Sequence, residues 1–141
     1  MHRPGLWRLA AAAFVGFLTL AGYATAQERR VYFIEPKDGA EVRSPVKVVM
    51  GVEGMTIKPS EAGVVAGTGH HHILLNQGPM RGGKVIPTDK THLHYGKGQT
   101  EATIKLEPGD YTLTMQFADG LHRSFGKKMA HTIKIKVLPP K

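Results

Sequence analysis

Histidines crowd into one part of this chain. Seven of the eight follow residue 69, and five of them lie between residues 70 and 94, in the segments His70-His71-His72 and His92-Leu93-His94. A folding core has no need of so many imidazoles in so short a stretch. Imidazole is the commonest protein ligand for metals and titrates near neutral pH. The crowding therefore predicts binding at a histidine-rich surface.

The spacing of two within each pair has a geometric meaning if both segments are strands. Residues i and i+2 of a strand project from one face, about 6.5–7 Å apart. His70 and His72 should therefore point one way, while His71 points with Ile73 and Leu75. His92 and His94 should likewise share a face. If the two strands are neighbours, four imidazoles converge at one sheet edge, a donor set that suits Cu(II), Zn(II) or Ni(II).

Two further residues can extend this donor set. His122 lies in a predicted turn, residues 118–123, and Met80 lies in a glycine-containing loop, where its thioether offers a soft ligand for Cu(I). We therefore predict a non-enzymatic protein that binds a transition metal, copper before zinc. The predicted ligands are His70, His72, His92, His94, His122 and Met80. The alternative is that these histidines only form hydrogen bonds within the protein, as His131 does if it is a core residue.

Motifs for catalysis are absent from the sequence. It contains neither a Gly-x-Ser-x-Gly elbow nor a His-Glu-x-x-His motif, and its carboxylates are scattered. Three imidazoles and a water can make a catalytic zinc site. A metal-dependent hydrolase is therefore the third hypothesis. The second hypothesis, which ranks between metal binding and hydrolysis, is a structural or interaction module that binds a protein or glycan of the cell envelope without metal.

The first 26 residues have the pattern of a secretory signal peptide. Arg3 and Arg8 precede an apolar run over residues 9–20, and Ala24-Thr25-Ala26 is a small-x-small cleavage site. An uncleaved membrane anchor is the alternative, but the run is short for a spanning helix of about 20 residues. We predict a periplasmic or secreted protein whose single domain covers residues 27–141, with no membrane span after cleavage.

Composition narrows the set of partners. Removal of Arg3 and Arg8 lowers the formal net charge from +8 to +6, and the remaining basic residues form no long run interleaved with aromatic residues. Nucleic-acid binding is therefore not expected. The chain has no cysteine, which excludes thiolate metal sites, a cysteine nucleophile and disulfides. The expected partner is a metal ion or an envelope protein, and the oligomeric state is left open.

The pattern of apolar residues predicts an all-β fold. About seven strands are expected, and the two clearest alternate apolar and polar residues over 111–117 and 131–137, as half-buried antiparallel strands do. Glycine- and proline-rich turns separate the strands, which favours an immunoglobulin-like antiparallel sandwich. Tyr111, after the turn at residues 107–110, has the position of a tyrosine corner, in which the phenol bonds to upstream backbone. The other expected strands are 31–35, 46–52, 70–75, 91–95 and 100–106.

Four motifs together resemble an uncharacterised bacterial family of short exported proteins, catalogued as a domain of unknown function. They are YFIEPKDG at 32–39, GTGHHH at 67–72, THLHYGKGQTE at 91–101 and QFADGLH at 116–122. The resemblance covers nearly all of the chain after residue 26 and implies export and a compact β domain, with no established activity. A looser likeness, in architecture and composition, is to periplasmic immunoglobulin-like copper carriers, which use His and Met ligands.

Overall fold

The computed structural model describes residue 22 and residues 24–141. The predicted signal peptide, residues 1–26, therefore lies largely outside the described residues. Helix in the described part is limited to two 3-10 turns, η1 (Ser60–Ala62) and η2 (Lys127–Met129). Neither turn has the length or the hydrophobicity that crossing a bilayer requires.

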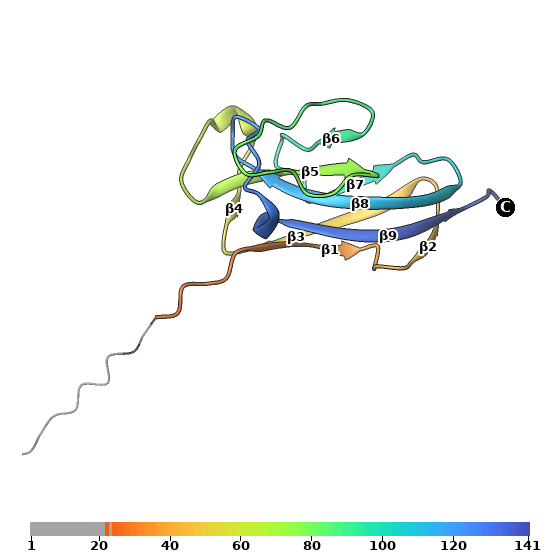
Figure 1. Cartoon of the computed structure of the whole chain (residues 1–141), viewed down its shortest axis with the longest axis horizontal. Helices are drawn as coiled ribbons and strands as arrows, with labels where there is room; N and C mark the ends of the chain where they lie inside the picture. Colours follow the sequence, from red (N-terminus) through yellow and green to blue (C-terminus); the bar gives the residue numbers. More distant parts are fainter. Residues whose placement is uncertain (1–21, 23) are drawn as a thin grey trace, which may run out of the picture.

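The described residues form nine strands in two sheets (Figure 1). The first sheet has the order β1-β3-β7, from β1 (Arg30–Glu35), β3 (Val46–Glu53) and β7 (Glu101–Ile104). The second has the order β2-β9-β8-β5, and both β4 and β6 pair with β5 at its end. Its strands are β2 (Glu41–Arg43), β4 (Thr56–Ile57), β5 (Thr68–Leu75), β6 (His92–His94), β8 (Gly109–Ala118) and β9 (Ala130–Leu138).

The arrangement is the predicted immunoglobulin-like sandwich. β1-β3-β7 have the connectivity of strands A, B and E, and β5, β8 and β9 that of C, F and G. The tyrosine corner is also confirmed, because the Tyr111 hydroxyl donates to the Glu107 carbonyl at 2.8 Å. Two expectations need correction. The strands number nine rather than about seven, and β2–β9 and β4–β5 are parallel pairs in an otherwise antiparallel fold.

The core lies between the two sheets and follows the predicted period of two. Leu113, Met115 and Phe117 of β8 are fully buried and pack with the apolar face of β9 and with β3. Burying a side chain of this size contributes about 1.5–3 kcal/mol relative to leaving it exposed. Residues of this core on the other strands include Val46, Val48, Met50, Ile73, Ile133, Ile135 and Val137.

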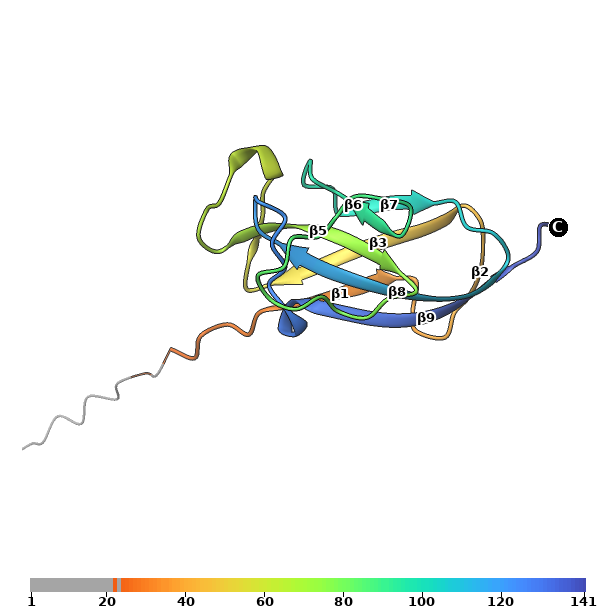
Figure 2. The ribbon, with the colours of Figure 1, turned by 45° about the horizontal axis from the view of Figure 1, so that its top comes forward.

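The outer face of the β5–β8 pair is buried as well, which the alternation of β8 does not predict. Thr114 and Gln116 point away from the core, yet neither is exposed to solvent. The chain between β5 and β6, residues 76–91, turns back along this sheet and covers that face (Figure 2). Gln116 holds this cover, because its Oε1 accepts from Met80 N at 3.0 Å while its Nε2 donates to Gly126 O at 3.1 Å. A second, small apolar cluster lies underneath and contains Leu74, Ile86, Ala118 and Met80.

Candidate metal centre

Four imidazoles meet on this covered outer face. His70 and His72 project from β5, and the antiparallel pairing of β5 with β6 places His94 directly opposite His72. His122 comes from the turn after β8, near Ala118, which pairs with His70. The sequence left open whether the two His-x-His segments are neighbours, and the structure pairs them as β5 and β6. The hydrogen-bonded pair of β5 and β6 supplies three of the rings, and the turn after β8 supplies the fourth.

The ring nitrogens are close enough to share one ion. His70 Nε2 lies 2.9 Å from His72 Nε2 and 3.2 Å from His122 Nδ1. One nitrogen from each of the four rings falls within 4.8 Å of all the others. A Zn–N bond of about 2.0–2.1 Å implies ligand separations of about 3.3 Å in a tetrahedral site, and about 2.9 and 4.1 Å in a square-planar site. A separation of 4.8 Å exceeds the tetrahedral value by about 1.5 Å and the longer square-planar value by about 0.7 Å, so small movements of the rings bring the group to the geometry of an imidazole metal site.

Hydrogen bonding alone leaves this group poorly satisfied. A neutral ring nitrogen carries either one proton or one lone pair, so His70 Nε2 can pair fully with only one of its two close neighbours. His94 Nε2 is buried and has no hydrogen-bond partner among the residues that the structure describes. Unpaired buried polar atoms cost about 1–3 kcal/mol each. A cation among the rings would accept a lone pair from each of them.

Burial disfavours the charged form of His70, His72 and His94. His70 and His72 have no exposed surface, whereas His94 and His122 are half-buried. Burial, and then the positive charge that His94 and His122 can carry, lowers the pKa of His70 to about 4. Burial and the other rings lower the pKa of His72 to about 2, and burial also lowers the pKa of His94. Neutral imidazole is the form that binds a metal.

The group borders an open cleft on the side of His94. A cleft of about 530 Å³ lies there, lined by His94, Ser60, Glu61, Lys97 and Gln99 together with Pro59 and Gly96. Gly96 packs directly on the His94 ring, since a Cβ at residue 96 would lie 2.2 Å from His94 Nε2 and Cε1. Only a glycine leaves His94 in this position.

Asp119 builds the turn that carries His122. Its Oδ1 accepts from Leu121 N at 2.9 Å and from Arg123 N at 3.0 Å, and its Oδ2 accepts from Arg123 Nε at 2.8 Å. Burial opposes ionisation of this carboxyl, but the hydrogen bonds from Arg123 and Leu121 hold its pKa below the usual value. Neither Asp119 nor Gly96 was among the residues predicted from the sequence. The short spacing of Asp119 before His122 was the available signal.

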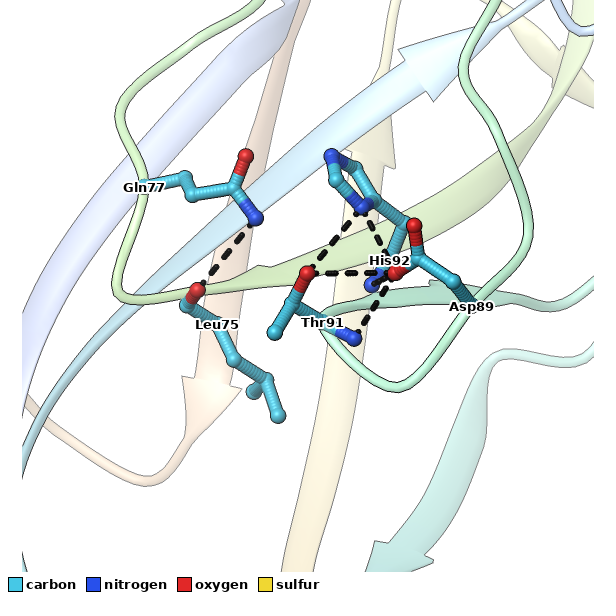
Figure 3. A network of polar contacts seen from close by, with 5 residues as sticks. All are labelled: Leu75, Gln77, Asp89, Thr91 and His92. Atoms are coloured by element: carbon cyan, nitrogen blue, oxygen red, sulfur yellow. Dashed lines mark hydrogen bonds and ion pairs between the residues drawn. The ribbon is translucent and has the colours of Figure 1, made fainter.

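Two of the six predicted ligands lie apart from this group of four. His92 pairs with Leu74 rather than with a histidine, and its Nδ1 lies 2.8 Å from Asp89 Oδ1. The same oxygen accepts from the backbone N of Thr91 and of His92, both at 2.9 Å (Figure 3). Met80 packs in the small apolar cluster with Leu74 and Ile86.

The remaining two histidines of the domain face the core side of the sheet. His71 is fully buried, and its ring packs edge-on to Phe117 with the centroids 5.2 Å apart. This confirms the predicted split between His71 and its two neighbours. His131 Nδ1 accepts from Phe33 N at 3.1 Å, which gives it the structural use that was the alternative for this residue.

Fold and site together define a β-sandwich with an imidazole group on one covered face. The chain belongs to the family described as a domain of unknown function, DUF4399, whose sequence profile matches residues 48–138. That range contains all four grouped histidines. No curated protein matches the chain, and no solved structure does either.

Proposed function

We propose that this protein is exported and binds one transition-metal ion, copper before zinc, through His70, His72, His94 and His122. The observation that carries the proposal is the meeting of four ring nitrogens within 4.8 Å from two strands and a turn. The donor set contains nitrogen only, which suits Cu(II), Zn(II) or Ni(II) better than Cu(I). Among divalent ions, Cu(II) binds such ligands most tightly in the general affinity order.

Non-enzymatic binding is the form of the proposal that the residues favour. His70 and His72 have no exposed surface, so an ion held by all four rings is reached only from the side of His94 and His122. Export is proposed on the signal-peptide pattern of residues 1–26. An exported chain without cysteine meets metals outside the reducing cytosol, where nitrogen ligands hold Cu(II).

The test is thermal unfolding of chelator-treated protein, spanning residues 27–141, with Cu(II), Cu(I), Zn(II) or Ni(II) added separately. A ligand at 100 times its dissociation constant stabilises the folded state by about 2.7 kcal/mol, which raises the midpoint by several degrees or more in a domain of this size. We expect the largest rise with Cu(II).

Two histidines of one short strand provide the variant and its matched control. His94→Ala removes a grouped imidazole and should abolish most of the rise, whereas His92→Ala removes a ring held by Asp89 and should retain it. The absence of a rise with every metal would refute the proposal. An equal loss in both variants would refute the choice of ligands.

A further inference from the structure

The four grouped histidines are not held in the same way. His70, His72 and His94 lie on paired strands, where the backbone ladder fixes their positions. His122 lies in a turn, and its backbone has a φ of 61°, in the left-handed region that a residue other than glycine seldom adopts. Something outside the sheet must hold this backbone for His122 Nδ1 to lie 3.2 Å from His70 Nε2.

The carboxylate of Asp119 contacts the chain on both sides of His122. It accepts from the backbone N of Leu121 and of Arg123, the residues that immediately precede and follow the histidine. The backbone of Asp119 closes the same turn, because its carbonyl accepts from His122 N at 2.8 Å and its own N donates to Arg123 O at 3.0 Å. Asp119 itself is 8% exposed, so water competes little for these bonds.

The turn also fits closely against a second loop. A Cβ at Gly120 would lie 2.0 Å from the Gly63 carbonyl oxygen, so the two backbones are in direct contact there. On the other side, Ile86 N donates to the His122 carbonyl at 2.8 Å. The turn is thus braced from two directions, and the side-chain bonds that set its internal shape come from Asp119.

We propose that Asp119 is the positioning residue of the metal site: its carboxylate holds the left-handed turn that brings His122 to the three strand histidines. This inference rests on the proposed function. Asp119 does not bind the ion itself, since its two oxygens are occupied by Leu121 and Arg123.

Two substitutions at one position separate the shape of the turn from its charge. Asp119→Asn retains an oxygen that can accept from Leu121 N and Arg123 N, but removes the negative charge and the ion pair with Arg123 Nε. Asp119→Ala removes every acceptor. Loss of a residue that orients a ligand typically weakens metal binding about 10–100-fold. We expect that loss for Asp119→Ala and a change of no more than a few-fold for Asp119→Asn.

A matched control exists at the other end of the sheet. Asp38 also accepts a backbone hydrogen bond, from Lys134 N at 2.8 Å, and Lys134 pairs with Thr112, far along β8 from Ala118. Asp38→Ala therefore removes a carboxylate-to-backbone hydrogen bond of the same kind away from the histidines and should leave metal affinity unchanged.

The experiment measures Cu(II) affinity by chelator competition and counts the coordinating nitrogens by electron paramagnetic resonance. The wild-type protein and Asp119→Asn should show four nitrogens, and Asp119→Ala should show three, as His122→Ala does. Asp119→Ala with unchanged affinity and four nitrogens would overturn the inference. If Asp119→Ala does not fold, Asp119→Ser, which keeps one acceptor, takes its place with the same criteria.

A second readout does not depend on metal. In the metal-free protein, nitrogen-15 NMR of the imidazoles should show the His122 and His70 signals moving in Asp119→Ala, while those of His131, on the core side, stay in place. Failure of the wild type to bind any metal would refute the proposed function, and these shifts would still decide the role of Asp119. Unmoved His122 signals in Asp119→Ala would overturn the positioning role of Asp119.

Discussion

Replacing Gly96 by alanine should disable the proposed metal site without removing any of its four histidines. The new Cβ would lie 2.2 Å from His94 Nε2 and Cε1, and 2.9 Å from Ser60 Oγ. Ordinary contact begins at 3.4 Å, so the His94 ring must retreat by roughly 1.2 Å. Metal–ligand bonds tolerate only about 0.2 Å. The displaced ring should therefore leave the coordination sphere of the proposed ion, and metal affinity should fall about 10–100-fold.

The folded state itself should change little in this variant. Gly96 is not among the glycines with positive φ, so alanine brings no backbone strain. The half-buried His94 can rotate toward the adjacent cleft, so the unfolding free energy of the metal-free protein should drop by less than about 1 kcal/mol. Chelator competition measures the affinity, and thermal unfolding without metal measures the stability.

Gly78→Ala is the matched control. Gly78 also lacks a positive φ, and no heavy atom lies within 4 Å of its Cβ position, so this change should alter neither quantity. Equal Cu(II) affinity in Gly96→Ala and Gly78→Ala would refute the reasoning, because a ring moved by more than 1 Å cannot remain a ligand in the same geometry.

Two further predictions concern the fold without metal. Burial lowers the pKa of His70 and of His71 from 6.5 to about 4, and that of His72 to about 2. Below pH 6.5 these three histidines therefore bind protons in the unfolded chain while they remain neutral in the folded protein. Stability should therefore fall with decreasing pH, by up to about 1.4 kcal/mol per pH unit for each histidine. His71→Leu removes two unpaired buried nitrogens. It should reduce the dependence of the unfolding free energy on pH by about a third, measured by urea unfolding between pH 6.5 and 5. An unchanged dependence would show that His71 is not a histidine with a lowered pKa in the folded state. Tyr111→Phe loses the hydrogen bond to the Glu107 carbonyl, so its unfolding free energy in the same assay should be lower by about 1 kcal/mol, with Cu(II) affinity unchanged. Equal stability of the variant and the wild type would show that this bond contributes nothing.

The fold was predicted correctly where the alternation of apolar and polar residues shows which side chains of a strand are buried. The alternation in β8 and β9 identified the core face residue by residue, because a strand in a sandwich buries every second side chain. It failed for β2 and β4, of three and two residues, which are too short to show a period. Their parallel pairing depends on where distant chain segments meet, and no local pattern encodes that.

The site divides along the same line. From the sequence alone follow the all-β class, the separation of His71 from His70 and His72, and the choice of imidazole chemistry, because these depend on strand period and residue type. Only the tertiary structure decided which histidines meet. The register places His94 opposite His72 and His92 opposite Leu74. The turn that Asp119 holds brings His122, with its left-handed backbone, to His70 across 52 residues of chain. Strand register and turn geometry are set by the packing of the whole sandwich. The spacing of two therefore places His92 and His94 on one face, but it cannot say which of the two lies opposite a histidine of β5.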